Sequence, residues 1–91
     1  MGEDPEEVIE RVGRRIAELR VRAKLTQAEV AEALDTTVNN FQRIEHGLQN
    51  LTIRTLVRIA KVLGVSVIEI FKMPAPKSSR VRGRPRARRL T

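Results

Sequence analysis

Two predicted helices with almost no chain between them constrain the fold of this sequence most strongly. Thr26 and Glu29 form a T-x-x-E pattern, which is typical of a helix N-terminus, and apolar residues follow at helical spacing up to Leu34. A second helix is predicted over 38–46, and Gly47 after it is typical of a helix end. The join contains only about three residues, so the two helices must cross at a sharp angle.

Three further helices are predicted, over 5–23, 53–63 and 67–73, and no segment shows the alternation of a strand. The first has an apolar stripe on one face and mostly arginine on the other. The sequence therefore predicts an all-α fold of five helices. The side chains expected in its core are Val12, Ile16, Leu19, Ala23, Val30, Ala31, Leu34, Phe41, Ile44, Leu56, Ile59, Ala60, Leu63 and Phe71.

The charge of the chain is concentrated at its C-terminal end. The sequence has 18 basic and 11 acidic side chains, a net charge of +7, and the whole excess lies in residues 74–91. This segment has few large apolar residues, so it cannot bury enough surface to offset the entropy of ordering. We predict a folded domain over 1–73 and a disordered basic tail over 74–91, a layout that suits a polyanionic partner.

Several classes of function are excluded by composition. The chain has no cysteine and only one histidine, so neither a disulfide nor a zinc site is expected. No nucleophile–base set or glycine-rich phosphate loop is visible, so we expect no enzyme, cofactor or metal. The acidic start lacks a signal-peptide pattern, and no stretch approaches the roughly 18 apolar residues of a membrane span. A cytoplasmic, nucleoid-associated protein is expected.

The outward face of the predicted helix over 38–46 is polar. A sharply crossed helix pair is a helix-turn-helix, whose second helix can lie in the major groove of DNA. Asn39 can pair with adenine, Arg43 with guanine, and Val38 can pack on a thymine methyl group. The alternative is an ordinary solvated helix face.

The sequence "LTQAEVAEALDTTVNNFQRIEHG", followed by "TIRTLVRIAKVLGVSVIEIF", resembles helix-turn-helix regulators of the lambdoid phage repressor type, also called the xenobiotic-response-element type. The resemblance covers about residues 12–71 and implies the lambda-repressor-like fold. It departs from the family at Asp35, where glycine is usual, and in the uncharged loop "LQNL". It implies base reading by Val38, Asn39 and Arg43, and a partly buried salt bridge between Arg20 and Glu45. Phosphate contacts are expected from Gln27, Thr37, Asn40, His46 and Arg54, with Gln27 also supporting the next helix.

The tail contains R-G-R-P within the segment Arg82, Gly83, Arg84, Pro85 and Arg86, which is similar to the core of an AT-hook. That resemblance implies arginines inserted into an A·T-rich minor groove, where a narrow groove enhances the negative potential. A nonspecific polybasic tail is the alternative, and both would bind DNA phosphates.

These features predict a homodimeric transcriptional regulator that binds a pseudo-palindromic operator in double-stranded DNA. The dimer is expected because the last helix has more apolar residues than one core can cover, namely Val67, Ile68, Ile70, Phe71 and Met73. The main alternative is an antitoxin or other protein-interaction module whose DNA binding serves autoregulation. Single-stranded RNA is less favoured, because the chain lacks Trp and Tyr for stacking.

Overall fold

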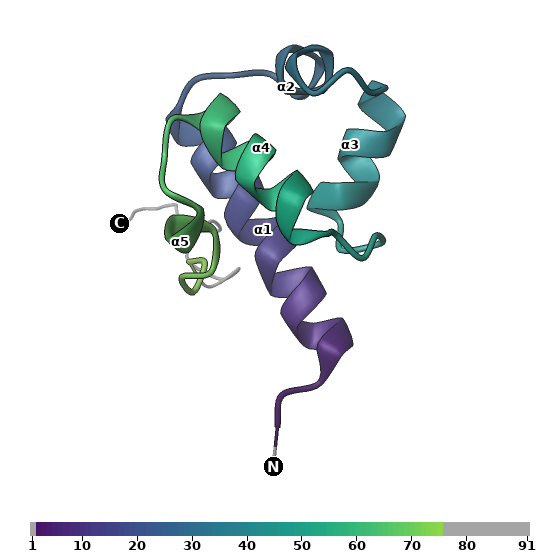
Figure 1. Cartoon of the computed structure of the whole chain (residues 1–91), viewed down its shortest axis with the longest axis vertical. Helices are drawn as coiled ribbons and strands as arrows, with labels where there is room; N and C mark the ends of the chain where they lie inside the picture. Colours follow the sequence, from purple (N-terminus) through teal and green to yellow (C-terminus); the bar gives the residue numbers. More distant parts are fainter. Residues whose placement is uncertain (1, 76–91) are drawn as a thin grey trace, which may run out of the picture.

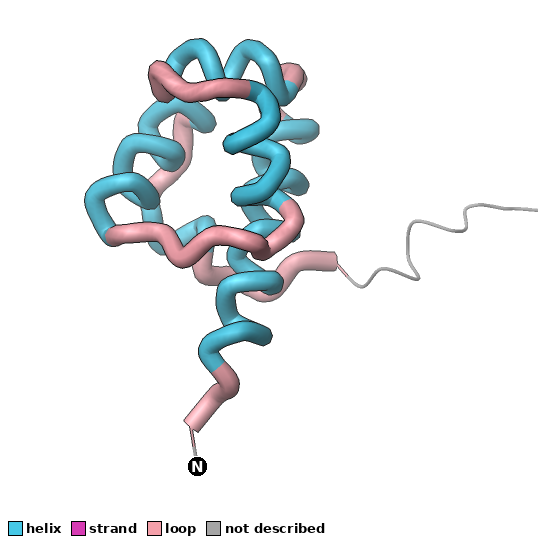
Figure 2. The backbone as a smooth tube through the Cα atoms, turned by 90° about the vertical axis from the view of Figure 1, so that its right-hand side faces the viewer, coloured by secondary structure: helices cyan, strands magenta, loops and turns pink. Residues whose placement is uncertain are grey.

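The computed structural model describes residues 2–75, and every regular element in that range is a helix (Figures 1 and 2). The elements are α1 (Pro5–Arg22), α2 (Gln27–Ala33), α3 (Val38–Glu45), α4 (Ile53–Leu63) and α5 (Val67–Ile70). The predicted all-α fold of five helices is confirmed. None of the helices in residues 2–75 is both long enough and apolar enough to cross a membrane. The AT-hook-like segment, residues 82–86, lies outside the described residues.

Side-chain caps start the helices where the sequence predicts them. The Oγ1 atom of Thr26 accepts a hydrogen bond from the Glu29 amide at 3.0 Å, and the Glu29 carboxylate accepts one from the Thr26 amide at 2.8 Å. Thr37 and Thr52 cap α3 and α4 by accepting from the amide three residues further on. Each cap gives a partner to an amide that the helix itself cannot satisfy, so even short helices have defined starts.

The core lies where the helices meet around α1. This helix packs against α3 and α5, while α2 packs against α3 and α4. Figure 1 shows α3 and α5 on opposite sides of the molecule, with α1 and α4 between them in that view. The largest fully buried side chains come from all five helices, namely Ile16, Val30, Phe41, Ile59 and Ile70. One continuous apolar core therefore holds both helices of the sharply crossed pair in place.

Two glycines allow α1 to approach the end of α3 closely. A Cβ atom on Gly13 would lie 2.6 Å from the carbonyl oxygen of Ile44 and 2.7 Å from that of Glu45. Gly47 has a φ of 73°, and a Cβ atom there would lie 2.7 Å from the Cα atom of Glu10. Any other residue at Gly13 would push the two helices apart.

Two expectations for individual side chains were wrong, and the burial of a third side chain was not expected. Phe71 is half-exposed, because α5 ends at Ile70 rather than at residue 73, and Ile70 alone fills the core at that point. Ala23 is exposed because it follows the last residue of α1. Arg15, which the sequence did not predict to lie in the core, is only 6% exposed.

Candidate nucleic-acid interface

The second helix of the crossed pair, α3, has one buried and one exposed face. Phe41, Ile44 and Glu45 are buried, at 0%, 4% and 6% exposure, and hold the helix against the core. Asn39 and Arg43 are exposed on the other face. Val38, at the first position of the helix, is also exposed. The three residues predicted to read bases are thus accessible from solvent together.

The turn before α3 is tight and is held from two sides. Asp35 has a φ of 59°, a left-handed conformation that aspartate tolerates better than most residues other than glycine. The amide of Thr36 donates to the carbonyl of Ala31 at 2.9 Å, which closes the end of α2. From α4, Arg58 donates to the carbonyl of Leu34 at 3.0 Å. Aspartate therefore occupies the usual glycine position without a break in the helix pair.

A polar network fixes the buried side of α3. Arg20 on α1 donates to Glu45 through Nε at 2.6 Å and through a second nitrogen at 3.3 Å. Gln27, at the start of α2, donates to the same carboxylate at 2.8 Å and accepts from Gln42 at 3.1 Å. The expected ion pair is therefore present. The buried Glu45 carboxylate of α3 accepts hydrogen bonds from Arg20 of α1 and Gln27 of α2, so it joins three helices.

Asn40 also bonds within the protein rather than pointing freely outward. Its Nδ2 atom donates to Thr36 at 2.8 Å, and its Oδ1 atom accepts a hydrogen bond from Gln49. The side chain thus connects the turn before α3 with the loop after it. An NH₂ group has two donors and each of Gln27 and Asn40 uses one here, so both retain a donor for a further acceptor.

Of the other predicted phosphate-binding residues, two flank α3 and one lies in α4. Thr37 caps its N-terminus and is exposed, while His46 follows its C-terminus and is exposed as well. Arg54 is exposed in the first turn of α4. Arg43 makes only a long contact, 3.5 Å, with the carbonyl of Leu48. Thr37, Arg43 and His46 therefore lie on or beside α3, while Arg54 lies at the start of α4.

A second network, centred on Arg15, was not expected from the sequence. Its guanidinium donates to the backbone carbonyl of Glu69 at 2.8 Å, to the Glu69 carboxylate at 3.2 Å, and to Glu18 at 3.0 Å. Glu18 in turn accepts from the amide of Ala75 at 2.5 Å. This network ties α5 and the end of the described chain to α1. Arg15 lies three residues after Val12 and four before Leu19, so it borders the apolar stripe of α1, and this position was the sequence signal that could have indicated its burial.

Both carboxylates of this network are stabilised in their ionised form. Partial burial opposes the ionisation of Glu18, but the hydrogen bond from Ala75 and the contact with Arg15 lower its pKa below the usual value. The hydrogen bond from Lys72 lowers the pKa of Glu69, and the charge of Arg15 acts in the same direction. Both groups therefore remain charged into mildly acidic solution.

Comparison with known proteins identifies the family. The model of the helix-turn-helix domain family matches residues 11–70. The chain belongs to this family. A curated relative, the HTH-type transcriptional regulator RamB of Mycobacterium tuberculosis, is 37% identical over 54 residues, which is 59% of this chain. These residues span only 11% of RamB, so the similarity concerns the helix-turn-helix domain.

Solved structures share the same fold. SinR, a master regulator for biofilm formation whose structure was determined in complex with DNA, is 31% identical with a TM-score of 0.61. The match covers 67% of this chain and 98% of that SinR chain. HppE, solved with Fe(II) and substrate, is 28% identical with a TM-score of 0.66 over 72% of this chain and 37% of its own. The resemblance to regulators of the lambdoid repressor type is confirmed, and the same fold forms a minor part of the HppE chain.

Proposed function

We propose that this protein binds specific sequences in double-stranded DNA as a transcriptional regulator, with α3 in the major groove. The observation that carries the proposal is the exposed face of α3. Within residues 2–75, the side chain of Asn39 has neither a hydrogen bond nor an ion pair, and Arg43 lies exposed one turn further along. The opposite face is anchored by the core and by Glu45, so the exposed groups are held on a fixed support.

The chemistry of the exposed residues suits base edges. The Asn39 amide can donate to adenine N7 and accept from adenine N6, and the Arg43 guanidinium can donate to both acceptors of guanine. Val38 can pack on a thymine methyl group. A helix face that contacts only solvent requires neither these side chains nor a polar network that fixes the helix from its buried side.

Phosphate contacts would position α3 in the groove. Thr37 and His46 are exposed at its ends, and Arg54 is exposed in the first turn of α4. Gln27 and Asn40 each keep an unused amide donor. Gln27 and Asn40 would therefore bind a phosphate while also maintaining their bonds within the protein. The loop after Gly47 is uncharged, so the basic residues beyond position 75 would supply much of the electrostatic affinity.

Selection of bound DNA fragments from a random pool, followed by binding assays, would test the role of α3. Replacing Asn39 or Arg43 by alanine should weaken binding to the selected sequence by about 1–3 kcal/mol each and leave nonspecific binding nearly unchanged. Lys61→Ala, which removes an exposed charge from the last turn of α4, serves as the control. Equal losses on specific and nonspecific DNA for Asn39→Ala would contradict base reading.

Deletion of residues 76–91 would test the role of the basic tail. The deleted segment has seven basic side chains, and each neutralised phosphate contributes about −0.9 to the slope of log affinity against log salt. The truncated protein should show a shallower slope with its sequence preference retained. Insertion of Arg82 and Arg84 into the minor groove predicts a further loss that is larger on A·T-rich flanking DNA. A nonspecific tail predicts the same loss on every flank.

We also propose that the protein acts as a homodimer through α5 and the residues after it. Ile68, Phe71 and Met73 are 66%, 50% and 70% exposed, which leaves an apolar surface without cover in the single chain. A two-fold dimer would place two copies of α3 on half-sites about 34 Å apart, as a pseudo-palindromic operator requires. Ile68→Asp should shift sedimentation toward the monomer, whereas Ile53→Asp, at an equally exposed isoleucine, should not.

The same exposed surface supports a second candidate, an antitoxin or other module that binds a different protein. In that case α5 would be covered by a heterologous chain, and DNA binding would serve autoregulation. Purification of a stable complex with another protein that is lost in Ile68→Asp would favour this candidate over the homodimer.

A further inference from the structure

The end of the described chain is fixed to the middle of α1. The backbone amide of Ala75 donates to the Glu18 carboxylate at 2.5 Å. The Arg15 guanidinium donates to the same carboxylate at 3.0 Å and to the Glu69 carbonyl of α5 at 2.8 Å. Because Arg15 is buried, this support can move little. We call the contacts of Glu18 with Ala75 and Arg15 the clasp, and it sets the point on the domain surface from which residues 76–91 start.

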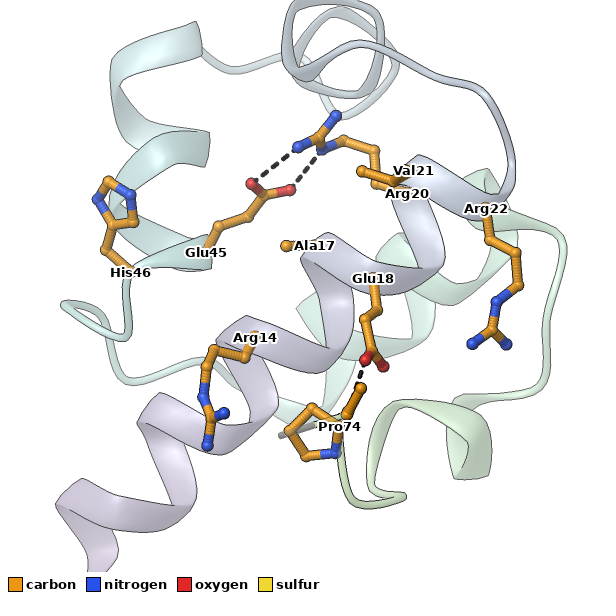
Figure 3. A pocket seen from close by; sticks show the side chains of 10 residues that line it. Arg14, Ala17, Glu18, Arg20, Val21, Arg22, Glu45, His46 and Pro74 are labelled. Carbon is orange, nitrogen blue, oxygen red and sulfur yellow. Dashed lines mark hydrogen bonds and ion pairs between the residues drawn. The ribbon is translucent and has the colours of Figure 1, made fainter. Parts of the chain in front are cut away.

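This starting point lies across one groove from the C-terminal end of α3. The groove has a volume of about 660 Å³, and Pro74 and His46 lie on different sides of it (Figure 3). Pro74 is buried and directly precedes the clasp, while His46 directly follows α3. Within α3, the groove is lined by Glu45, which is the last residue of that helix. The basic tail therefore starts near one particular end of the proposed recognition helix.

The groove itself offers residues 76–91 little to bind. The two carboxylates that line it, Glu18 and Glu45, are each paired with an arginine already. Arg14 and Arg22, which also line the groove, have the same charge as the seven basic side chains of the tail and would repel them. The tail is therefore left to bind an anion outside the domain, which in the proposed complex is the DNA.

We propose that Glu18, held by Arg15, is a positioning residue that directs the basic tail to the DNA at the C-terminal end of α3. This role depends on the proposed binding of α3 in the major groove. The first two cations of the tail, Lys77 and Arg80, follow Ala75 by two and five residues. Even a fully extended chain keeps them within about 7 Å and about 18 Å of that residue. Since the clasp lies beside the C-terminal end of α3, phosphates there are the first that the tail can reach.

Loss of the clasp would lengthen the unattached part of the chain without removing any charge of the tail. Ile70, the last residue of α5, is fully buried and would become the next fixed point. The separation along the chain to Lys77 would then rise from two residues to seven, and to Arg80 from five to ten. Effective concentration falls roughly as the −3/2 power of linker length, so it would drop about sixfold for Lys77 and about threefold for Arg80. The DNA affinity that the tail contributes should fall by a similar factor.

Binding of a selected operator by four full-length proteins, at about 100 mM salt, would test the clasp. In the natural chain, Glu18→Ala should bind about threefold to sixfold more weakly than Glu32→Ala, which removes the same charge from an exposed position of α2. In a chain whose seven basic tail residues are replaced by glutamine, the two substitutions should have equal effects, because the tail no longer binds phosphates. A loss that is the same with and without the tail charges would show that Glu18 is only structural, and would overturn the proposal.

Cleavage of DNA by a tethered iron–EDTA label would test the direction of the tail. The chain has no cysteine, so one introduced cysteine gives one labelled site. Leu48→Cys, in the loop after α3, and Ala33→Cys, before the turn that leads to α3, are reference labels for its two ends. Ser78→Cys should cleave on the same side of the half-site as Leu48→Cys, and over a wider range when Glu18→Ala is added.

The reference labels separate a failure of the clasp from a failure of the proposed function. Cleavage from Ser78→Cys on the side marked by Ala33→Cys, or equally on both sides, would overturn the role of the clasp while both reference patterns stay intact. If neither Leu48→Cys nor Ala33→Cys cleaves at fixed positions in the operator, α3 does not lie in the major groove. In that case the proposed function fails, and the role of the clasp fails with it.

Discussion

Replacement of Gly13 by alanine sets two effects of known size against each other. Within a helix, alanine is more favourable than glycine by about 1 kcal/mol, so an uncrowded site would be stabilised. At Gly13 the new Cβ atom would lie 2.6 and 2.7 Å from the carbonyl oxygens of Ile44 and Glu45. Both atoms belong to the backbone of α3, so neither can swing away as a flexible side chain could.

The steric effect should dominate. Relief of the clash requires α1 and α3 to separate by several tenths of an ångström, and overpacking of this kind costs about 1–3 kcal/mol, with rigid backbone neighbours toward the upper end. After the gain in helix propensity, Gly13→Ala should still lower the free energy of unfolding by about 1–2 kcal/mol. For a domain of this size, that corresponds to a drop of roughly 5–15 °C in Tm.

Thermal and urea unfolding followed by circular dichroism would measure the effect. Gly64→Ala is an informative control, because no atom lies within 4 Å of its added Cβ and only the strain of a φ of 75° remains. That strain costs about 1–2 kcal/mol. Because the clash would displace α3 itself, Gly13→Ala should also weaken specific DNA binding, and Gly64→Ala should not. A Tm equal to or above that of the wild type for Gly13→Ala would refute the close packing of α1 on α3.

Three further substitutions follow from the polar contacts. The pKa of Glu18 is lowered below its ordinary value of 4.5, so its stabilising contribution is present above about pH 4.5 and is lost as the pH falls through the folded-state pKa. The difference in unfolding free energy between wild type and Glu18→Gln should therefore shrink between about pH 6 and pH 3, and a constant difference in urea unfolding would contradict the pairing with Arg15 and Ala75. Glu45→Ala leaves buried donors without their acceptor and should cost about 3 kcal/mol, with a smaller loss when Arg20 is also replaced by methionine. Thr37→Ala removes the cap of α3 and should cost about 1 kcal/mol in thermal unfolding.

Local signals made most of the helices predictable. The start of α4 depends on the hydroxyl of Thr52 and its end on the left-handed Gly64, and both act within a few residues. The inward positions of α4 follow from a spacing of three and four residues, and Leu56 and Ile59 are indeed buried. Such features require no knowledge of the rest of the chain, because capping and helical periodicity are properties of short segments.

The failures involve contacts between distant residues. Arg15 is buried because α5, 54 residues further on, supplies both a carbonyl and a carboxylate to its guanidinium. Helical spacing places Arg15 beside the apolar stripe of α1, but nothing near it in sequence indicates that Glu69 is its partner. Phe71 was assigned to the core by its apolarity, but α5 is a single turn and Ile70 occupies the available space. In both cases the outcome depends on where another helix lies.

On α3, helical periodicity determines which side chains are exposed, and tertiary structure determines which partners the others have. Asn39 and Asn40 are identical and adjacent, yet a rotation of about 100° places one in solvent and the other between Thr36 and Gln49. The helical period distinguishes the two positions, but the partners of Asn40 come from loops whose paths the period does not define. Binding assays must separate these roles, because loss of Asn40 would remove two hydrogen bonds beside α3 as well as the proposed phosphate contact. A variant such as Asn40→Ala therefore reports on DNA contact only when its unfolding free energy is measured alongside, whereas Asn39→Ala should change binding with little change in stability.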